Sequence, residues 1–335
     1  MDEIIFLVNK VVISGAVLGS IYALGAIGVT LIFGILRFAH FAHGDMMTMG
    51  AFVAFLLAAL VGAMGITAPV PLAFVVLPLA VVITAVLALL IDRGFYAPLR
   101  ARGAKPVTLL IASIGVTLMI QGLIRLVFGS GTRNMYLDIE DKIIFRMDFG
   151  WLGGTRPLVL SQPQILMFFV TLACITGLHF FLTRTRMGKA MRATSDNLDL
   201  AQVSGINTQQ VVTVTWLIAG SLACLAGTML ALDVNLRPDL AFNIVLPIFA
   251  AAIVGGLGNA YGAIAGGLLI GVTEALAVFN WTAVLRPFAP YLPFGMELPA
   301  NLALVPTEYK LTVAFVILVI TLLWRPTGIF RGLST

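Results

Sequence analysis

Two histidines and a carboxylate stand together in the segment RFAHFAHGD, as His40, His43 and Asp45. A histidine pair at this spacing beside a carboxylate has the residue types of a transition-metal site. No third protein ligand is apparent, so we predict no bound metal. Gly44 and Asp45 instead indicate the start of a helix, with the histidines at its interface with water or lining a pathway. Helix N-termini inside membrane proteins can hold an amino-acid carboxylate.

A second set of polar residues recurs every four positions, as Ser113, Thr117 and Gln121. This spacing places the three side chains on one face of a helix, where they would line a pathway or bond a neighbouring helix. Arg125 and Glu274 would form a structural ion pair, or contact a charged substrate directly. Our candidate pathway residues are therefore His40, His43, Gly44, Thr48, Ser113, Thr117, Gln121 and Glu274. We predict no catalytic residues.

The polar segment 184–210 contains a predicted short helix of about eight residues. Asp196 is its expected N-cap, Asp199 lies in its first turn, and Gly205 is placed to adopt a left-handed conformation after its end. A helix this short is marginal in water on its own. Its apolar side would be covered by a cytoplasmic partner or by its own membrane domain, and consists of Leu198, Leu200, Ala201, Val203 and Ile206.

The elements that position these residues follow from composition. The chain has 335 residues, of which 60% are hydrophobic and only 10% charged, and its mean hydropathy is +1.05. Too few charges are present to solvate a globule of this size. The long apolar runs lack the alternation of barrel strands, so they must satisfy their backbone groups as helices. The sequence predicts an all-α polytopic membrane protein.

Nine spans are expected, within a range of eight to ten, and discontinuous or re-entrant helices fit the pattern. They cover 11–33, 46–64, 69–91, 107–128, 163–183, 211–232, 242–257, 260–281 and 311–324. Glycines recur four residues apart within them, which lets helix backbones approach closely in lipid. We expect most of these glycines to pack helices within one subunit, and the remainder to face a partner. The pairs are Gly15 with Gly19, Gly262 with Gly266, and Gly267 with Gly271.

Basic residues near the span ends give the orientation. One cluster extends from Arg93 to Lys105, a second from Arg184 to Arg192, and Arg325 with Arg331 form a third. All three should be cytoplasmic, which puts the N-terminus outside and the C-terminus inside. The net charge of +5 therefore reports topology, and we expect no nucleic-acid partner. Cys174 and Cys224 both lie in apolar segments, where neither a disulfide nor a metal pair is indicated.

We expect a single transmembrane domain over residues 1–335, with no cleaved leader. The charge-balanced loop 129–162 is predicted to be periplasmic. The proline-rich stretch 282–310 is predicted to be a periplasmic insertion of loops or short helices, and 284–304 would have room for one re-entrant segment.

Several motifs of known chemistry are absent. The sequence contains no G-x-x-x-x-G-K-[ST] phosphate loop, no HExxH and no GxSxG. We therefore predict that the chain is not an enzyme and does not itself hydrolyse ATP.

Long collinear segments resemble the Liv-type permease subunits of branched-chain amino acid ABC importers. They are FAHGDMMTMGAF at 41–52, IDRGFYAPLR at 91–100, LIASIGVTLMIQ at 110–121, RMGKAMRATSDNLDLAQVSGIN at 186–207, AAIVGGLGNAYGAIAGGLLIGVTEAL at 251–276 and EYKLTVAFVILVITLLWRPTGIF at 308–330. The resemblance covers nearly the whole chain.

This resemblance implies that 184–210 is a cytoplasmic coupling loop that seats on an ATPase subunit. The implied coupling residues are Arg192, Asp196, Leu198, Asp199, Leu200, Ala201, Gly205, Ile206 and Asn207. It also implies a bacterial inner membrane location and several partners: a related permease or a second copy, two cytoplasmic ATPases, a periplasmic solute-binding protein and membrane lipid. This chain would bind no cofactor, because ATP and magnesium would be bound by the ATPases.

The expected function is the permease subunit of an ATP-driven importer for a small polar solute. Branched-chain or other aliphatic amino acids are the favoured solutes, moved by alternating access. The alternative is an ion-coupled secondary transporter, or a channel, for a small solute such as urea or an amide. Ion-coupled carriers generally bury acidic or histidine relays, and this chain offers mainly Glu274.

Overall fold

The computed structural model describes residues 2–136, 144–147, 157–286, 299 and 301–330. The first helix is continuous over Asp2–Leu36 and consists of α1 (Asp2–Leu7), the π-helical η1 (Val8–Ile13) and α2 (Ser14–Leu36). At 1.5 Å per residue its 35 residues exceed the ~30 Å of a bilayer core, so it extends beyond the membrane at one end. The helix begins nine residues before the predicted span.

The remaining long helices follow the predicted order. They are α3 (His43–Ala63), α4 (Leu72–Ile91) continued by η2 (Asp92–Tyr96) and α5 (Ala97–Ala101), α6 (Pro106–Phe128), α7 (Gln162–Arg184), α10 (Thr208–Asp233), α11 (Phe242–Gly255), α12 (Ala260–Val278) and α14 (Lys310–Trp324). Within the described residues, eight helices are long and apolar enough to cross a membrane, whereas α11 has only 14 residues. The predicted all-α polytopic fold is confirmed.

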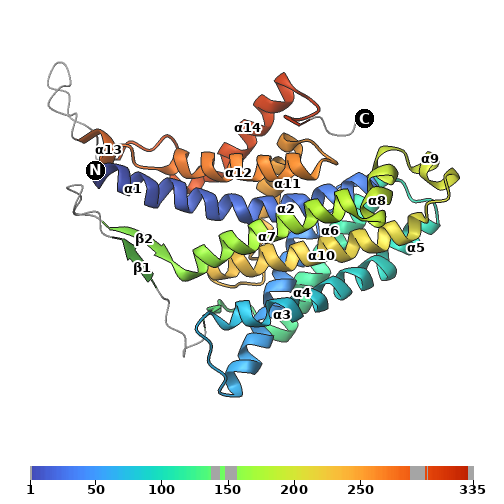
Figure 1. Ribbon diagram of the computed structural model, residues 1–335, viewed down its shortest axis with the longest axis horizontal. Helices are drawn as coiled ribbons and strands as arrows, with labels where there is room; N and C mark the ends of the chain where they lie inside the picture. The colour runs from blue at the N-terminus through green and yellow to red at the C-terminus, as the bar shows by residue number, and fades with distance from the viewer. Residues whose placement is uncertain (1, 137–143, 148–156, 287–298, 300, 331–335) are drawn as a thin grey trace.

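Short elements gather at the two ends of the bundle (Figure 1). The end that we call the basic end carries α5, α8 (Arg186–Asp196) and α9 (Leu198–Val203). The opposite end, the hairpin end, carries α1, α13 (Thr282–Leu285) and the antiparallel strands β1 (Ile144–Met147) and β2 (Leu158–Ser161). A short 3-10 turn, η6 (Thr307–Tyr309), precedes α14.

The strands lie in the segment 129–162, for which we predict a periplasmic loop but no strands. Asn9 of η1 holds β2 in place, since its side chain donates to the Pro157 carbonyl at 3.0 Å and accepts from the Val159 N–H at 3.0 Å. Residues 287–298 and 300 of the proline-rich stretch, which make up more than half of the predicted re-entrant segment at 284–304, lie outside the described residues.

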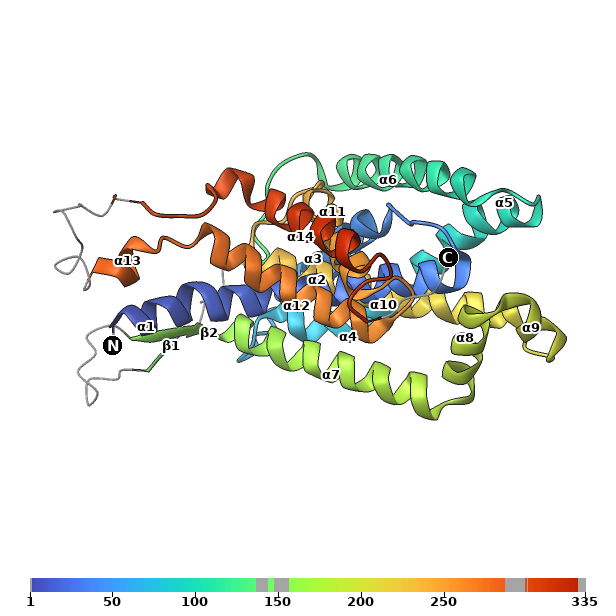
Figure 2. The same ribbon diagram turned by 90° about the horizontal axis from the view of Figure 1, so that it is seen from above.

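Two predicted basic clusters lie at the same end of the molecule, as their separation by an even number of spans requires. Arg100 lies on α5, Lys105 directly precedes α6, and Lys189 and Arg192 lie on α8. Figure 2 shows α5 and α8 at the same end of the bundle. Part of this charge is neutralised, because Arg100 forms a two-bond ion pair with Asp92 at 2.6 and 3.0 Å.

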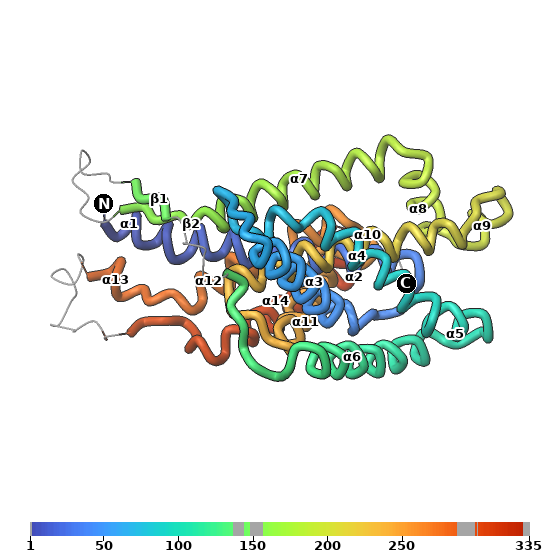
Figure 3. The backbone as a smooth tube through the Cα atoms, turned by 90° about the horizontal axis from the view of Figure 1, so that it is seen from below, coloured from blue at the N-terminus to red at the C-terminus, as the bar shows by residue number. Residues whose placement is uncertain are grey.

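The helix α2 lies at the centre of the bundle and packs against α12, α10 and α11. The flanking helices α6 and α7 lie on opposite sides of this core (Figures 2 and 3). Both helices expose apolar side chains on their outward faces, such as Leu126 of α6 and Phe169 of α7, as expected of a surface in contact with lipid.

Glycine lets α2 and α12 come into backbone contact. A Cβ atom at Gly267 would lie 2.5 Å from Ala23 Cα, and one at Gly271 would overlap the Gly19 backbone. From the α2 side, a Cβ at Gly15 would lie 3.0 Å from Val272 Cα. We call this contact the glycine seam.

The other predicted pair, Gly262 and Gly266, faces the α11 backbone at Gly255 and Ala251. All six predicted glycines therefore pack helices within this one chain.

Replacing Gly267 with alanine should destabilise the protein by about 1–3 kcal/mol, because the seam has no room for a methyl group. Gly177→Ala is the matched control, since nothing lies within 4 Å of its Cβ position on α7. That change should be neutral or stabilise by up to about 1 kcal/mol. Thermal unfolding of the purified variants measures both effects, and equal melting temperatures would contradict the seam.

Candidate functional site

A buried polar region surrounds the start of α3. Asp45, in the first turn of this helix, is 1% exposed. Gln121 of α6 donates its side-chain N–H to Asp45 Oδ1 at 2.9 Å. Arg125, one turn further along α6, donates to Gln121 Oε1 at 3.2 Å. A chain of polar contacts therefore links the C-terminal part of α6 to the beginning of α3.

The connector 37–42 brings the same face of α6 against this region. It runs back from the end of α2 into the bundle (Figure 2), and the Phe41 N–H donates to Ser113 Oγ at 3.2 Å. Ser113 and Thr117 are both buried. The predicted polar stripe of Ser113, Thr117 and Gln121 thus packs along the connector and the first turn of α3 and does not face lipid.

Two helices begin beside each other here. Thr48 Oγ1 on α3 accepts a hydrogen bond from the Ala241 N–H at 3.1 Å, directly before α11 begins at Phe242. A Cβ atom at Gly44 would lie 3.0 Å from the Ala241 carbonyl oxygen, so only glycine fits this approach comfortably. Neither helix has a side-chain N-cap bond. Helix N-termini carry partial positive charge, so the region favours an anionic group.

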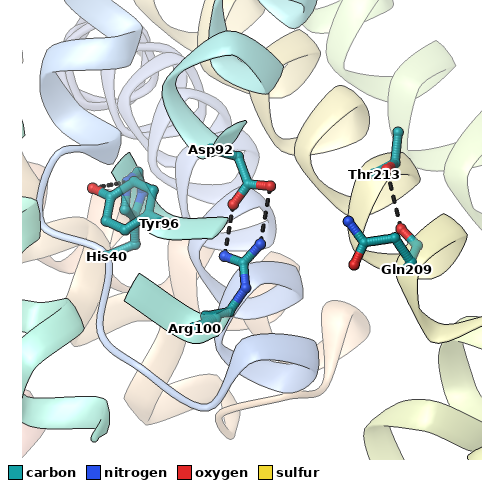
Figure 4. A network of polar contacts seen from close by, with 6 residues as sticks. All are labelled: His40, Asp92, Tyr96, Arg100, Gln209 and Thr213. Atoms are coloured by element: carbon teal, nitrogen blue, oxygen red, sulfur yellow. Dashed lines mark hydrogen bonds and ion pairs between the residues drawn. The ribbon is translucent and has the colours of Figure 1, made fainter. Parts of the chain in front are cut away.

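The two histidines lie deeper than an interface with water. His40 and His43 are fully buried. His40 Nε2 and the Tyr96 hydroxyl share a hydrogen bond of 3.0 Å (Figure 4). Trp216 stacks on Tyr96 with ring centroids 5.3 Å apart.

His43 packs against α2, where a Cβ at Gly28 would lie 2.6 Å from its Nε2. Neither ring nitrogen of His43 has a hydrogen-bond partner among the described residues. No group of three histidine, cysteine or acidic side chains is placed to hold a metal ion in the described ranges. The histidine pair thus belongs to a packed aromatic cluster with Tyr96 and Trp216.

The predicted pairing of Arg125 with Glu274 is wrong. Arg125 bonds Gln121, whereas Glu274 Oε2 on α12 accepts from the Tyr22 hydroxyl of α2 at 2.9 Å. Glu274 is 1% exposed, and its hydrogen bond joins the two helices of the glycine seam, α2 and α12, and not the α3 polar region. The other candidate pathway residues, from His40 to Gln121, lie around the connector and the start of α3.

The α8–α9 segment differs in detail from its prediction. Asp196 is the last residue of α8, and Asn197 is the N-cap of α9, with its Oδ1 accepting from the Leu200 N–H at 2.9 Å. The helix has six residues, fewer than the eight expected. Asp196 was the wrong N-cap because Asn197 has the extended backbone that a cap requires, with φ −151°. Gly205 does adopt the left-handed conformation, with φ +81°.

Apolar side chains of α9 face solvent. Leu200 is 64% and Val203 87% exposed, and Leu198 is also exposed. Only Ala201 is buried against the rest of the chain, and Ile206 is half-buried. Asn207 caps α10 by accepting from the Gln210 N–H at 3.1 Å. Most of the predicted apolar side is therefore uncovered in the isolated chain.

Several residues of these sites were not identified from the sequence. Tyr22 and Trp216 are aromatic residues inside apolar runs, and Tyr96 lies in the segment DRGFYAPLR just after such a run. No spacing distinguishes the three from core packing. Asn197 carries a signal that was available, because asparagine is as good an N-cap as the aspartate beside it.

Comparison with known proteins gives matches over nearly the full length. Residues 11–322 match the family model described as branched-chain amino acid transport system, permease component. The chain is 31% identical over 330 residues to the high-affinity branched-chain amino acid transport system permease protein BraD of Pseudomonas aeruginosa, which covers 98% of this chain and 97% of that protein. It is 32% identical to the corresponding LivH of Escherichia coli K12, with 94% and 93% covered. The probable LivH of Methanocaldococcus jannaschii is 29% identical, with 96% and 92% covered.

The Gln121→Leu variant should lose about 1–3 kcal/mol of stability, because the buried Asp45 carboxylate loses its amide donor. The double variant Asp45→Leu with Gln121→Leu should lose less than the sum of the two single changes, since it removes both partners. Thermal unfolding of the four proteins gives this coupling. Gln210→Leu, an exposed site on α10, is the control. Strictly additive effects would contradict the contact.

Proposed function

The chain belongs to the family of permease components of branched-chain amino acid transport systems, and we propose that it forms the membrane pathway of an ATP-driven importer for branched-chain or other aliphatic amino acids. The observation that carries this proposal is the family match over 11–322, together with relatives aligned over more than nine-tenths of both chains. The solute named for those relatives is the basis for assigning aliphatic amino acids here.

The polar region at the start of α3 is our proposed pathway wall. It combines two uncapped helix N-termini, those of α3 and α11, with the side chains of Thr48, Ser113 and Gln121. Partial positive charge at the two helix N-termini suits the carboxylate of an amino acid that passes when the transporter changes conformation. Alternating access would then move α3 and α11 relative to α6.

Energy for uphill transport would come from separate ATPase subunits, because this sequence carries no phosphate-binding loop. The α8–α9 segment is the proposed contact with them. Exposed Leu200 and Val203 on this six-residue helix are unfavourable in water. They would be buried if the helix docked into an apolar groove on a partner. A second permease chain and a periplasmic solute-binding protein complete the proposed assembly.

In this proposal the basic end faces the cytoplasm of a bacterial inner membrane and the hairpin end faces outside. The support is the position of the basic clusters around α5 and α8, which follows the positive-inside rule.

Two changes should uncouple the transporter without harming insertion. Gly205→Val places a β-branched residue at φ +81°, and Leu200→Asp puts a charge on the exposed apolar side of α9. Both variants should be present in the membrane in normal amounts, but uptake of labelled leucine by the cells should fall at least about tenfold, because the contact with the ATPase is lost. Gly65→Val is the control, because Gly65 has the same left-handed conformation, with φ +73°, in the α3–α4 loop. Wild-type uptake in both α9 variants would remove α9 from the mechanism.

Single cysteines test the orientation. With Cys174 and Cys224 replaced, Thr132→Cys should react with an impermeant thiol reagent added outside intact cells. Asn197→Cys should react only after the membrane is opened. Both positions are exposed in the structure. Labelling of both residues from the same side would overturn the proposed topology.

A further inference from the structure

A cavity of about 330 Å³ lies at the basic end, between α2, α8 and the turn that joins α11 to α12. It is separate from the polar region at the start of α3. The residues that define its chemistry are Thr30, Leu31, Ile35, Arg192, Ser195 and Asp196.

Hydrogen bonds between helices hold the cavity walls together. Arg37, at the end of α2, donates its guanidinium N–H to the Ser195 carbonyl of α8 at 2.5 Å. At the other wall, His179 of α7 shares a 2.8 Å hydrogen bond with Tyr261 of α12. Asn259 caps α12 through the N–H groups of Tyr261 and Gly262. The cavity is therefore bounded by four helices, α2, α7, α8 and α12, which these hydrogen bonds join in two pairs, and it is not a gap between loops.

Opposite charges stand one helical turn apart on one wall. Arg192 and Asp196 are four residues apart on α8 and both line the cavity. Both side chains are exposed to solvent, and neither forms a hydrogen bond or ion pair with another residue in the described part of the chain. The Thr30 hydroxyl in the α2 wall is fully buried and also lacks a partner in the described part of the chain. The cavity lining thus includes one buried hydroxyl and two solvent-exposed charged side chains.

The remaining wall is aliphatic. Leu31 and Ile35 of α2, Leu182 of α7 and Met191 of α8 all line the cavity and are buried. A ligand that matches these walls carries one carboxylate, one ammonium group and a short aliphatic side chain. A simple anion or a lipid phosphate would meet the Asp196 carboxylate as well as Arg192, so the charges do not favour it.

We propose that this cavity is a second binding site, for a zwitterionic aliphatic amino acid whose carboxylate contacts Arg192 and whose ammonium group contacts Asp196. Because α8 leads through Asn197 into α9, a bound amino acid would tie the coupling segment to α2 and the α12 turn. Amino acid that has accumulated on the cytoplasmic side would then inhibit further uptake. This inference rests on the proposed function and orientation.

Binding is tested on the assembled transporter in lipid vesicles, without ATP or solute-binding protein, using radiolabelled leucine. Leucinamide and 4-methylpentanoate, which each lack one charge, should compete at least about tenfold more weakly than leucine. Arg192→Gln should weaken leucine binding by about tenfold or more, and Arg192→Lys should recover part of it. Asp196→Asn should reduce the preference for leucine over 4-methylpentanoate. Equal competition by all three compounds, or unchanged binding in Arg192→Gln, would overturn the site.

Inhibition is tested in the same vesicles, with leucine added on the face where ATP is hydrolysed. Ala260→Leu fills the cavity from the α12 side and should raise the inhibitory leucine concentration at least about tenfold relative to the uninhibited rate of that variant. Ala265→Leu, on the same helix but outside the cavity lining, should be inhibited like the wild type. Equal inhibition of the two variants would contradict the proposal. If Ala260→Leu does not fold, the Arg192→Gln binding result decides.

The second binding site and the proposed transport function can be refuted separately. Vesicles with a leucine-free ATP side that still accumulate leucine, but show neither binding nor inhibition at the cavity, would refute only the second site. Vesicles that accumulate no leucine at all would refute the proposed function.

Discussion

Direct backbone contact between α2 and α12 is the constraint on which the rest of the structure depends. The first-helix residues Gly15, Gly19 and Ala23 meet Gly267 and Gly271, so the two helices approach until backbone touches backbone. In lipid no hydrophobic force drives helices together, and close van der Waals packing of small residues takes its place. The Tyr22–Glu274 hydrogen bond joins the same two helices, and the seam fixes the central helix against which α10 and α11 pack.

With α2 fixed, the chain can place irregular backbone inside the bundle. The connector 37–42 leaves α2 at Arg37, which has a left-handed conformation with φ +57°, and returns to start α3 among buried groups. Backbone polar groups at membrane depth must find partners within the protein. Ser113 and Thr48 provide them by accepting from the Phe41 and Ala241 N–H groups. The same groups that satisfy the irregular backbone also make the polar region that we propose as the pathway.

Hydropathy and glycine spacing predict most of this fold, because span length and close packing are local properties of the sequence. Gly205 was likewise predictable, since its left-handed conformation ends a short helix. The Asp196 and Asn197 assignment failed because both residue types cap helices well and the choice depends on where α8 ends. The Arg125–Glu274 pairing failed because helix rotation and neighbour order, which decide contacts across the bundle, are not encoded in span length. The β1–β2 hairpin is too short for alternation to reveal it.

In the proposed mechanism, this chain moves an amino acid only when separate ATPases drive it. The most direct measurement is uptake of radiolabelled leucine into vesicles that contain the chain with its ATPase partners and solute-binding protein, against vesicles that contain the chain alone with an imposed proton or sodium gradient. The account predicts accumulation that requires ATP in the first case and none above background in the second. Gradient-driven accumulation by the chain alone would contradict it and favour a secondary transporter.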